Sequence, residues 1–376
     1  MHSPENNGSD PVWLQYNAPT DSRLCNLSGV ISGPISVSVF AGNLQLSAAN
    51  TYSGNVTNSG GELYANYPEN AGSSGPLGEG NMITFNGGTL GFSTNNTYDY
   101  SSRFSTAAGQ AYSLDVPANQ LVQFATGLTS SGGTLTKKGS GTLTLSAQCA
   151  YTGQTFVNGG TLIINSGNLA SYTTVLAGTL GGTGTLSGPV TVNAGTTLAP
   201  GASIGSVGTL TINNALTNGG NLAIEVNKSL SPSNDFVVVS GVLTNTGTGT
   251  VTVSNLGPAL AVGDKFTLFS KPMQNGAAMT VTGAGATWAN HLAVDGSISV
   301  TAVSRPALKF TQTGSNNLQF SWDTSFGNYK LQAQTNSLGV GLGTNWADYP
   351  GGGTSPVTVP INATNGTVFF RLVSTP

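Results

Sequence analysis

Charge is scarce in this 376-residue chain, where only 7% of the residues are Asp, Glu, Lys or Arg, against about 25% in an ordinary globular protein. Between Lys138 and Glu225 there is no acid, base or histidine. The net charge of −3 gives no electrostatic reason to expect nucleic acid or an anionic membrane surface as a partner. The paired carboxylates that saccharide hydrolases use are excluded from the uncharged stretch.

Long apolar runs and cysteines are scarce too. Apolar residues stand singly or in short runs such as Val237–Val239, far below the roughly 18 that a membrane-spanning helix requires, so no spanning segment is expected. The two cysteines, Cys25 and Cys149, lie in unrelated surroundings, so we expect no disulfide. The opening residues MHSPENNGSDPVW show no basic region followed by an apolar one. No secretory signal is visible, and we expect a natural N-terminus that is processed or incomplete.

Glycine, in contrast, is abundant at 53 residues, and it marks an internal repeat. Leu44–Leu63 aligns without gaps on Leu143–Leu162, so that Tyr52 meets Tyr151. Each copy has a Gly or Asn that can take positive φ, followed by apolar residues alternating with Thr or Gln, as in a β-strand. The tripeptide Gly-Thr-Leu recurs, starting at Gly88, Gly133, Gly141, Gly160, Gly178, Gly184 and Gly208.

Strands this short cannot bury a core alone, but coils of them stacked on one another can. The pattern predicts an all-β fold in which a poorly defined segment at residues 1–27 leads into a right-handed parallel β-helix at 28–303. Aliphatic side chains would fill its centre, and neutral Thr, Asn and Ser side chains would keep its exterior soluble without charge. At Pro306 the composition changes to turn signals between short alternating strands, which predicts a small antiparallel β-sandwich at 304–376.

The clearest copy, Gly133–Ser146 followed by Tyr151-Thr-Gly and Val157–Leu162, closely resembles the autotransporter-associated β-strand repeat of Gram-negative secreted proteins. Weaker resemblance extends over roughly residues 28–303. It implies a secreted or cell-surface passenger domain whose repeats are structural and carry no known catalytic residue. The Phe320–Trp322 and Phe369–Leu372 segments are similar to the immunoglobulin- or fibronectin-like modules that follow repeat arrays in some secreted bacterial proteins.

Few residues are candidates for chemistry. Asp235, Asp264 and Asp295 would form a lyase-like or calcium-binding cluster if they met across layers, although isolated acids more often cap turns. His2 and His291 are the only imidazoles, and no Cys or His pair has metal-ligand spacing. We therefore expect no metal, no cofactor and no enzymatic activity.

A second small group comprises the basic pair at Lys137 and Lys138, for which a solvated turn is the favoured interpretation, and four aromatic residues. Packing is the default role of these aromatic rings, and stacking on a sugar is the alternative. The possible glycan contacts are Tyr52, Tyr151, Trp322 and Trp346.

Three functions follow, in order of preference. The first is a non-enzymatic, adhesin-like scaffold that is extracellular or on the cell surface, with cell-surface components as possible partners. Open solenoid ends would also let copies join into a homo-oligomer or filament. The second is a module that binds extracellular polysaccharide, and the third is a β-helix polysaccharide lyase or glycosidase.

Overall fold

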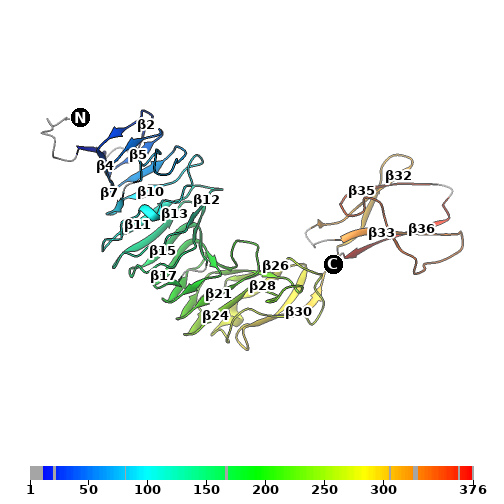
Figure 1. Cartoon of the computed structure of the whole chain (residues 1–376). Helices are drawn as coiled ribbons and strands as arrows, with labels where there is room; N and C mark the ends of the chain where they lie inside the picture. The colour runs from blue at the N-terminus through cyan, green and yellow to red at the C-terminus, as the bar shows by residue number, and fades with distance from the viewer. Residues whose placement is uncertain are drawn as a thin grey trace.

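The computed structural model describes residues 12–19, 23–80, 82–165, 168–304, 306–324, 329–362 and 365–374. These residues form an all-β protein, and most of them build a parallel β-solenoid that runs as a continuous stack from the N-terminal end (Figure 1). The predicted fold class is confirmed. No helix among the described residues is long and apolar enough to cross a membrane.

Short strands recur on several faces of the stack. One sheet has the order β1 (Val12–Asn17), β4 (Ile35–Ala41), β7 (Val56–Asn58), β9 (Ile83–Phe85), and another has the order β16 (Asn168–Leu169), β18 (Thr185–Leu186), β21 (Thr209–Ile212), β24 (Phe236–Val239). A pair is formed by β3 (Ser32–Gly33) and β6 (Thr51–Tyr52). The largest sheet contains β2 (Leu24–Leu27), β5 (Asn43–Leu46), β8 (Glu62–Ala65), β10 (Thr89–Gly91), β11 (Ala111–Asp115), β12 (Leu121–Phe124), β13 (Thr134–Lys138), β14 (Thr142–Leu145), β15 (Thr155–Ile164), β17 (Thr173–Gly182), β19 (Val190–Val192), β20 (Thr197–Pro200), β22 (Leu216–Asn218), β23 (Asn221–Val226), β25 (Leu243–Asn245), β26 (Thr250–Asn255) and β28 (Thr280–Gly283).

The leucines of the repeat pair in register from coil to coil. Since residues on parallel strands lie directly over their partners, each leucine packs on the next and leaves water entirely. One such aliphatic column, all of it buried, runs from β14 to β26 through Leu143, Leu162, Leu180, Leu198, Leu222 and Val251. In every Gly-Thr-Leu unit the leucine is buried in the core, as the sequence predicted.

The C-terminal end of the stack is covered by a different kind of structure. There β27 (Lys265–Thr267), β30 (Ser297–Val303) and β29 (Ala286–His291) form an antiparallel sheet, with the short 3-10 helix η2 (Gly276–Ala278) beside β29. Large apolar side chains from this region continue the solenoid core. They are Phe266, Leu268, Phe269, Met273, Met279, Leu292 and Ile298.

Beyond residue 304 the chain forms two antiparallel sheets around a separate, smaller core. Their orders are β31 (Lys309–Gln312), β32 (Asn317–Ser321), β35 (Val357–Pro360) and β34 (Ala347–Asp348), β33 (Tyr329–Asn336), β36 (Thr367–Ser374). The rings of Phe320 and Phe370 pack between the sheets with centroids 4.4 Å apart. The sheets agree with the expected antiparallel module, while its immunoglobulin- or fibronectin-like character and the boundaries 1–27, 28–303 and 304–376 stay predictions.

Candidate functional site

The two repeat tyrosines are core residues. Tyr52 and Tyr151 are both 0% exposed, and burial raises the pKa of each phenol. The Tyr151 hydroxyl forms a hydrogen bond with the Thr155 hydroxyl, which in turn bonds Ser171. Neither ring presents a face on which a sugar could stack. In the structure both tyrosines have the packing role that was their default interpretation.

The two tryptophans of the C-terminal module differ from one another. Trp322 is buried in the smaller core, whereas Trp346 is partly exposed and the Arg371 guanidinium lies 4.3 Å from the centre of its ring. A cation over the ring occupies one of its two faces. Of the four predicted glycan contacts, Trp346 is the one with accessible ring surface, and its contact with a glycan stays a prediction.

The three aspartates considered as a cluster do not meet. Asp264 pairs with Lys228 at 2.8 Å, and Asp295 pairs with Lys265 at 2.7 Å. Asp235 is fully buried, and its two oxygens accept the backbone N–H groups of Gly208 at 2.7 Å and Glu225 at 2.8 Å. Among the described residues no group of three or more His, Cys, Asp or Glu side chains could hold a metal ion.

The remaining imidazole and thiols have structural surroundings. His291 lies on β29, where its Nε2 is 3.1 Å from the Ser299 hydroxyl, and His2 lies outside the described residues. Cys25 and Cys149 are free, and Cys149 is buried. Burial raises the pKa of the Cys149 thiol, which disfavours the reactive thiolate.

Two pairs of neighbouring carboxyl groups were not predicted from the sequence. Asp235 lies beside Glu225, and burial together with this neighbour raises the pKa of Asp235 to about 9. Glu62, which accepts a 2.8 Å hydrogen bond from the Tyr64 hydroxyl, lies near Asp115, and its pKa is raised mainly by burial. Each pair joins residues 10 or more positions apart in the sequence, so only the folded chain reveals it. A carboxyl with a raised pKa beside a second carboxyl can share a proton with it.

Lys137 overturns the interpretation of the basic pair as a solvated turn. It lies on β13 and is 0% exposed. Because side chains alternate between the two faces of a strand, Lys138 points outward when Lys137 points inward. The buried ammonium donates hydrogen bonds to the carbonyl oxygens of Lys138, Gly139 and Gly159. Two of these carbonyls belong to its own coil and the third to the following coil, so the lysine joins neighbouring layers.

Burial lowers the pKa of Lys137 to about 8, although the charge of Asp115 opposes the shift. The folded pKa is thus below the unfolded one, so between these values the unfolded chain binds more protons and stability rises with pH. From pH 7 to pH 10 the free energy of unfolding of the wild type should increase by about 2 kcal/mol relative to that of Lys137→Met. Chemical denaturation of both proteins at each pH measures this difference, and Lys138→Met is the control that should retain the wild-type rise.

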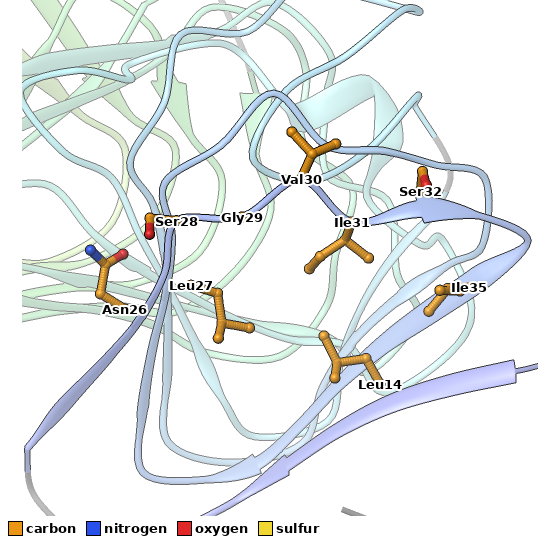
Figure 2. A pocket seen from close by; sticks show the side chains of 9 residues that line it. All are labelled: Leu14, Asn26, Leu27, Ser28, Gly29, Val30, Ile31, Ser32 and Ile35. Carbon is orange, nitrogen blue, oxygen red and sulfur yellow. The ribbon is translucent and has the colours of Figure 1, made fainter. Parts of the chain in front are cut away.

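At the N-terminal end of the solenoid, the described residues surround a hollow. Its volume is about 600 Å³, and it is lined by apolar side chains, with Asn26, Ser28 and Ser32 as its polar members. Figure 2 shows Leu14, Leu27, Ile31 and Ile35 pointing toward one another across it. The first strands β1, β2 and β3 pair with β4, β5 and β6 on one side and with no described strand on the other. We call this feature the N-terminal hollow.

Comparison with known proteins adds one finding. Residues 41–64 and 135–164 match the passenger-associated-transport-repeat family. No curated protein matches the chain. The first matched segment contains β5, β6, β7 and most of β8, and the second contains most of β13 and all of β14 and β15. These repeats within a parallel β-solenoid fit an autotransporter passenger scaffold.

Proposed function

We propose that the chain is the passenger scaffold of a secreted or cell-surface protein, in which the solenoid acts as a non-enzymatic stalk. The observation that carries the proposal is that each of the two transport-repeat matches spans two successive coils of one aliphatic stack. A stalk needs a rigid continuous core and a soluble exterior, and the in-register leucines and neutral outer side chains supply both.

The arrangement of the acids supports a structural rather than a catalytic role. Asp235 binds two backbone N–H groups in the interior, and Asp264 and Asp295 form separate ion pairs. An adhesin-like role would use the partly exposed Trp346 of the C-terminal module as a contact for other cells or extracellular polysaccharide.

Export of the full chain tests the proposal. The chain would be placed between a secretory leader and the translocation unit of an autotransporter in a Gram-negative host, and surface exposure would be measured with antibody and added protease on intact cells. We expect surface labelling and a protease-resistant fragment that contains the solenoid. As the control, the host autotransporter's own passenger is expressed with the same leader and translocation unit. If that passenger reaches the surface while this chain stays in the periplasm, the proposal is wrong.

A further inference from the structure

The N-terminal hollow is an apolar socket, and the outer edges of β1, β2 and β3 beside it pair with no strand of the described chain. None of its nine lining residues is charged. Its floor is the exposed end of the solenoid core, because Leu14, Leu27, Ile31 and Ile35 all pack against that core from one side. Inside the molecule every such layer is covered by the aliphatic side chains of the next coil. The hollow therefore presents an apolar surface of the kind that aliphatic side chains cover elsewhere in the solenoid.

The opposite end of the molecule carries a matching apolar projection. Leu338, Val340 and Leu342 lie in the loop between β33 and β34 and are 86%, 55% and 66% exposed, and Leu338 is the most exposed large apolar residue of the described chain. Glycines separate the three residues, and residues 337–346 contain no charge. We call Leu338–Leu342 the C-terminal tip.

The backbone of the tip is held in place while its side chains face solvent. Val340 donates its N–H to the Ser337 carbonyl at 3.0 Å, and the Asn336 amide donates to the Gly341 carbonyl at 2.7 Å. Gly343 donates its N–H to the Gln334 side chain at 2.9 Å. Because these bonds tie the loop to β33, ordering the tip against a partner costs less conformational entropy than ordering a free segment.

Direct stacking of one solenoid on another is blocked at the C-terminal end. There the antiparallel sheet β27–β30–β29 and η2 fill the position of a further coil, and their apolar residues complete the core. Strands β2 and β4, which contribute Leu27 and Ile35 to the hollow, and the C-terminal module lie at opposite ends of the molecule (Figure 1). A second copy of the chain can therefore bring its tip to the hollow, whereas the chain's own tip is remote from it.

We propose that the C-terminal tip of one copy seats in the N-terminal hollow of a second copy, so that chains associate head to tail. Both surfaces are apolar and uncharged, and each copy carries one of each. Such a contact is heterologous, since two different surfaces meet, and it leaves a free hollow and a free tip on every dimer. The association goes beyond the scaffold function, and a chain that stayed monomeric would leave that function intact.

Sedimentation velocity on the full chain and two variants tests this contact. The tip variant is Leu338→Ser/Val340→Ser/Leu342→Ser, and the rim variant is Ser28→Glu/Val30→Glu/Ser32→Glu, which places carboxylates on three exposed residues of the hollow. The wild type should associate increasingly with concentration, and each variant alone should associate at least about 100-fold more weakly. An equimolar mixture should form dimers and nothing larger, because only one intact hollow and one intact tip remain per pair.

Exposed aliphatic residues elsewhere provide the matched control. Val242→Ser/Val262→Ser/Val294→Ser changes side chains that are 58%, 65% and 72% exposed, and this variant should associate like the wild type. Circular dichroism would confirm that all variants fold. A wild type that remains monomeric overturns the proposal, as does a tip variant that associates normally. A mixture that stays monomeric while the wild type dimerises also overturns it and indicates a symmetric contact instead.

Discussion

Replacing Gly160 with alanine should reduce the free energy of unfolding by about 3 kcal/mol or more. Gly160 has φ of +58°, and a Cβ there would lie 2.2 Å from the carbonyl oxygen of Gly141 in the preceding coil. The left-handed conformation alone costs a side chain roughly 1–2 kcal/mol. Overlap with backbone adds at least as much again, because neither coil can move without breaking the register of the ladder.

Gly195→Ala is the control that separates these two contributions. Gly195 has φ of +80°, yet nothing lies within 4 Å of the position of its Cβ. The loss there should be about 1 kcal/mol, from backbone conformation alone. Thermal and chemical denaturation of both variants measure the comparison. If Gly160→Ala and Gly195→Ala lose the same amount of stability, close packing between coils is not what requires glycine at position 160.

Arg103→Met should reduce the free energy of unfolding by a comparable amount, for an electrostatic reason. Arg103, in the short 3-10 helix η1 (Ser101–Arg103), pairs with Glu69 at 3.3 Å, and the two side chains are only 8% and 2% exposed. Glu69 also accepts a 2.7 Å hydrogen bond from the Tyr100 hydroxyl. Removing the guanidinium leaves an uncompensated buried carboxylate, at a cost of about 3–5 kcal/mol.

The pH dependence of this loss has a defined sign. Burial already raises the pKa of Glu69, and the charge of Arg103 opposes that shift, so its removal raises the pKa further. A carboxyl whose folded pKa is raised stabilises the fold at low pH, and the stability is lost as pH rises through that pKa. The difference between wild type and Arg103→Met should therefore shrink as the solution is acidified.

An exposed ion pair gives the matching control. Lys265 and Asp295 approach to 2.7 Å, but their side chains are 54% and 42% exposed, so Lys265→Met should cost only a small part of the stability lost in Arg103→Met. The double variant Arg103→Met/Glu69→Leu should recover most of the lost stability, since it removes the carboxylate as well. A double variant as unstable as Arg103→Met would assign the effect to packing rather than to the stranded charge.

The solenoid could be predicted because the sequence pattern that specifies it is short and repeated along the chain. Each Gly-Thr-Leu unit carries a strand and an adjacent turn, and the alignment of Leu44 on Leu143 already indicated equivalent layers. In the structure Leu44 pairs with Leu63 and Leu143 pairs with Leu162, as successive layers require. Parallel register then follows, because a one-residue slip would turn every leucine outward.

The inward direction of Lys137 could not be predicted in the same way. Its neighbour Lys138 has the same chemistry, and a basic pair followed by a glycine is ordinarily solvated. What decides the direction is the phase of β13, in which Leu135 and Lys137 share the inner face. Strict alternation from the buried leucine was a signal available in the sequence, but the cost of burying an ammonium argued against following it.

The carboxyl pairs and the structure at the two ends of the stack could not be predicted from the sequence. They depend on contacts between residues that are far apart in the chain, which no local sequence pattern records. Asp235 reaches Gly208 and Glu225 through the lengths of the connecting loops, and the antiparallel cover at the C-terminal end replaces the expected open edge. The parts of the chain that depart from the repeat are therefore where sequence analysis was least informative.

The uncharged exterior of residues 139–224 determines how the proposed stalk would respond to salt. Dissolved ions weaken attractions and repulsions between charged side chains, and this stretch has none to weaken. Its coils should keep the same length and stiffness in fresh water and in brine. A surface appendage built in this way would hold its shape through changes in salinity that loosen proteins held together by ion pairs.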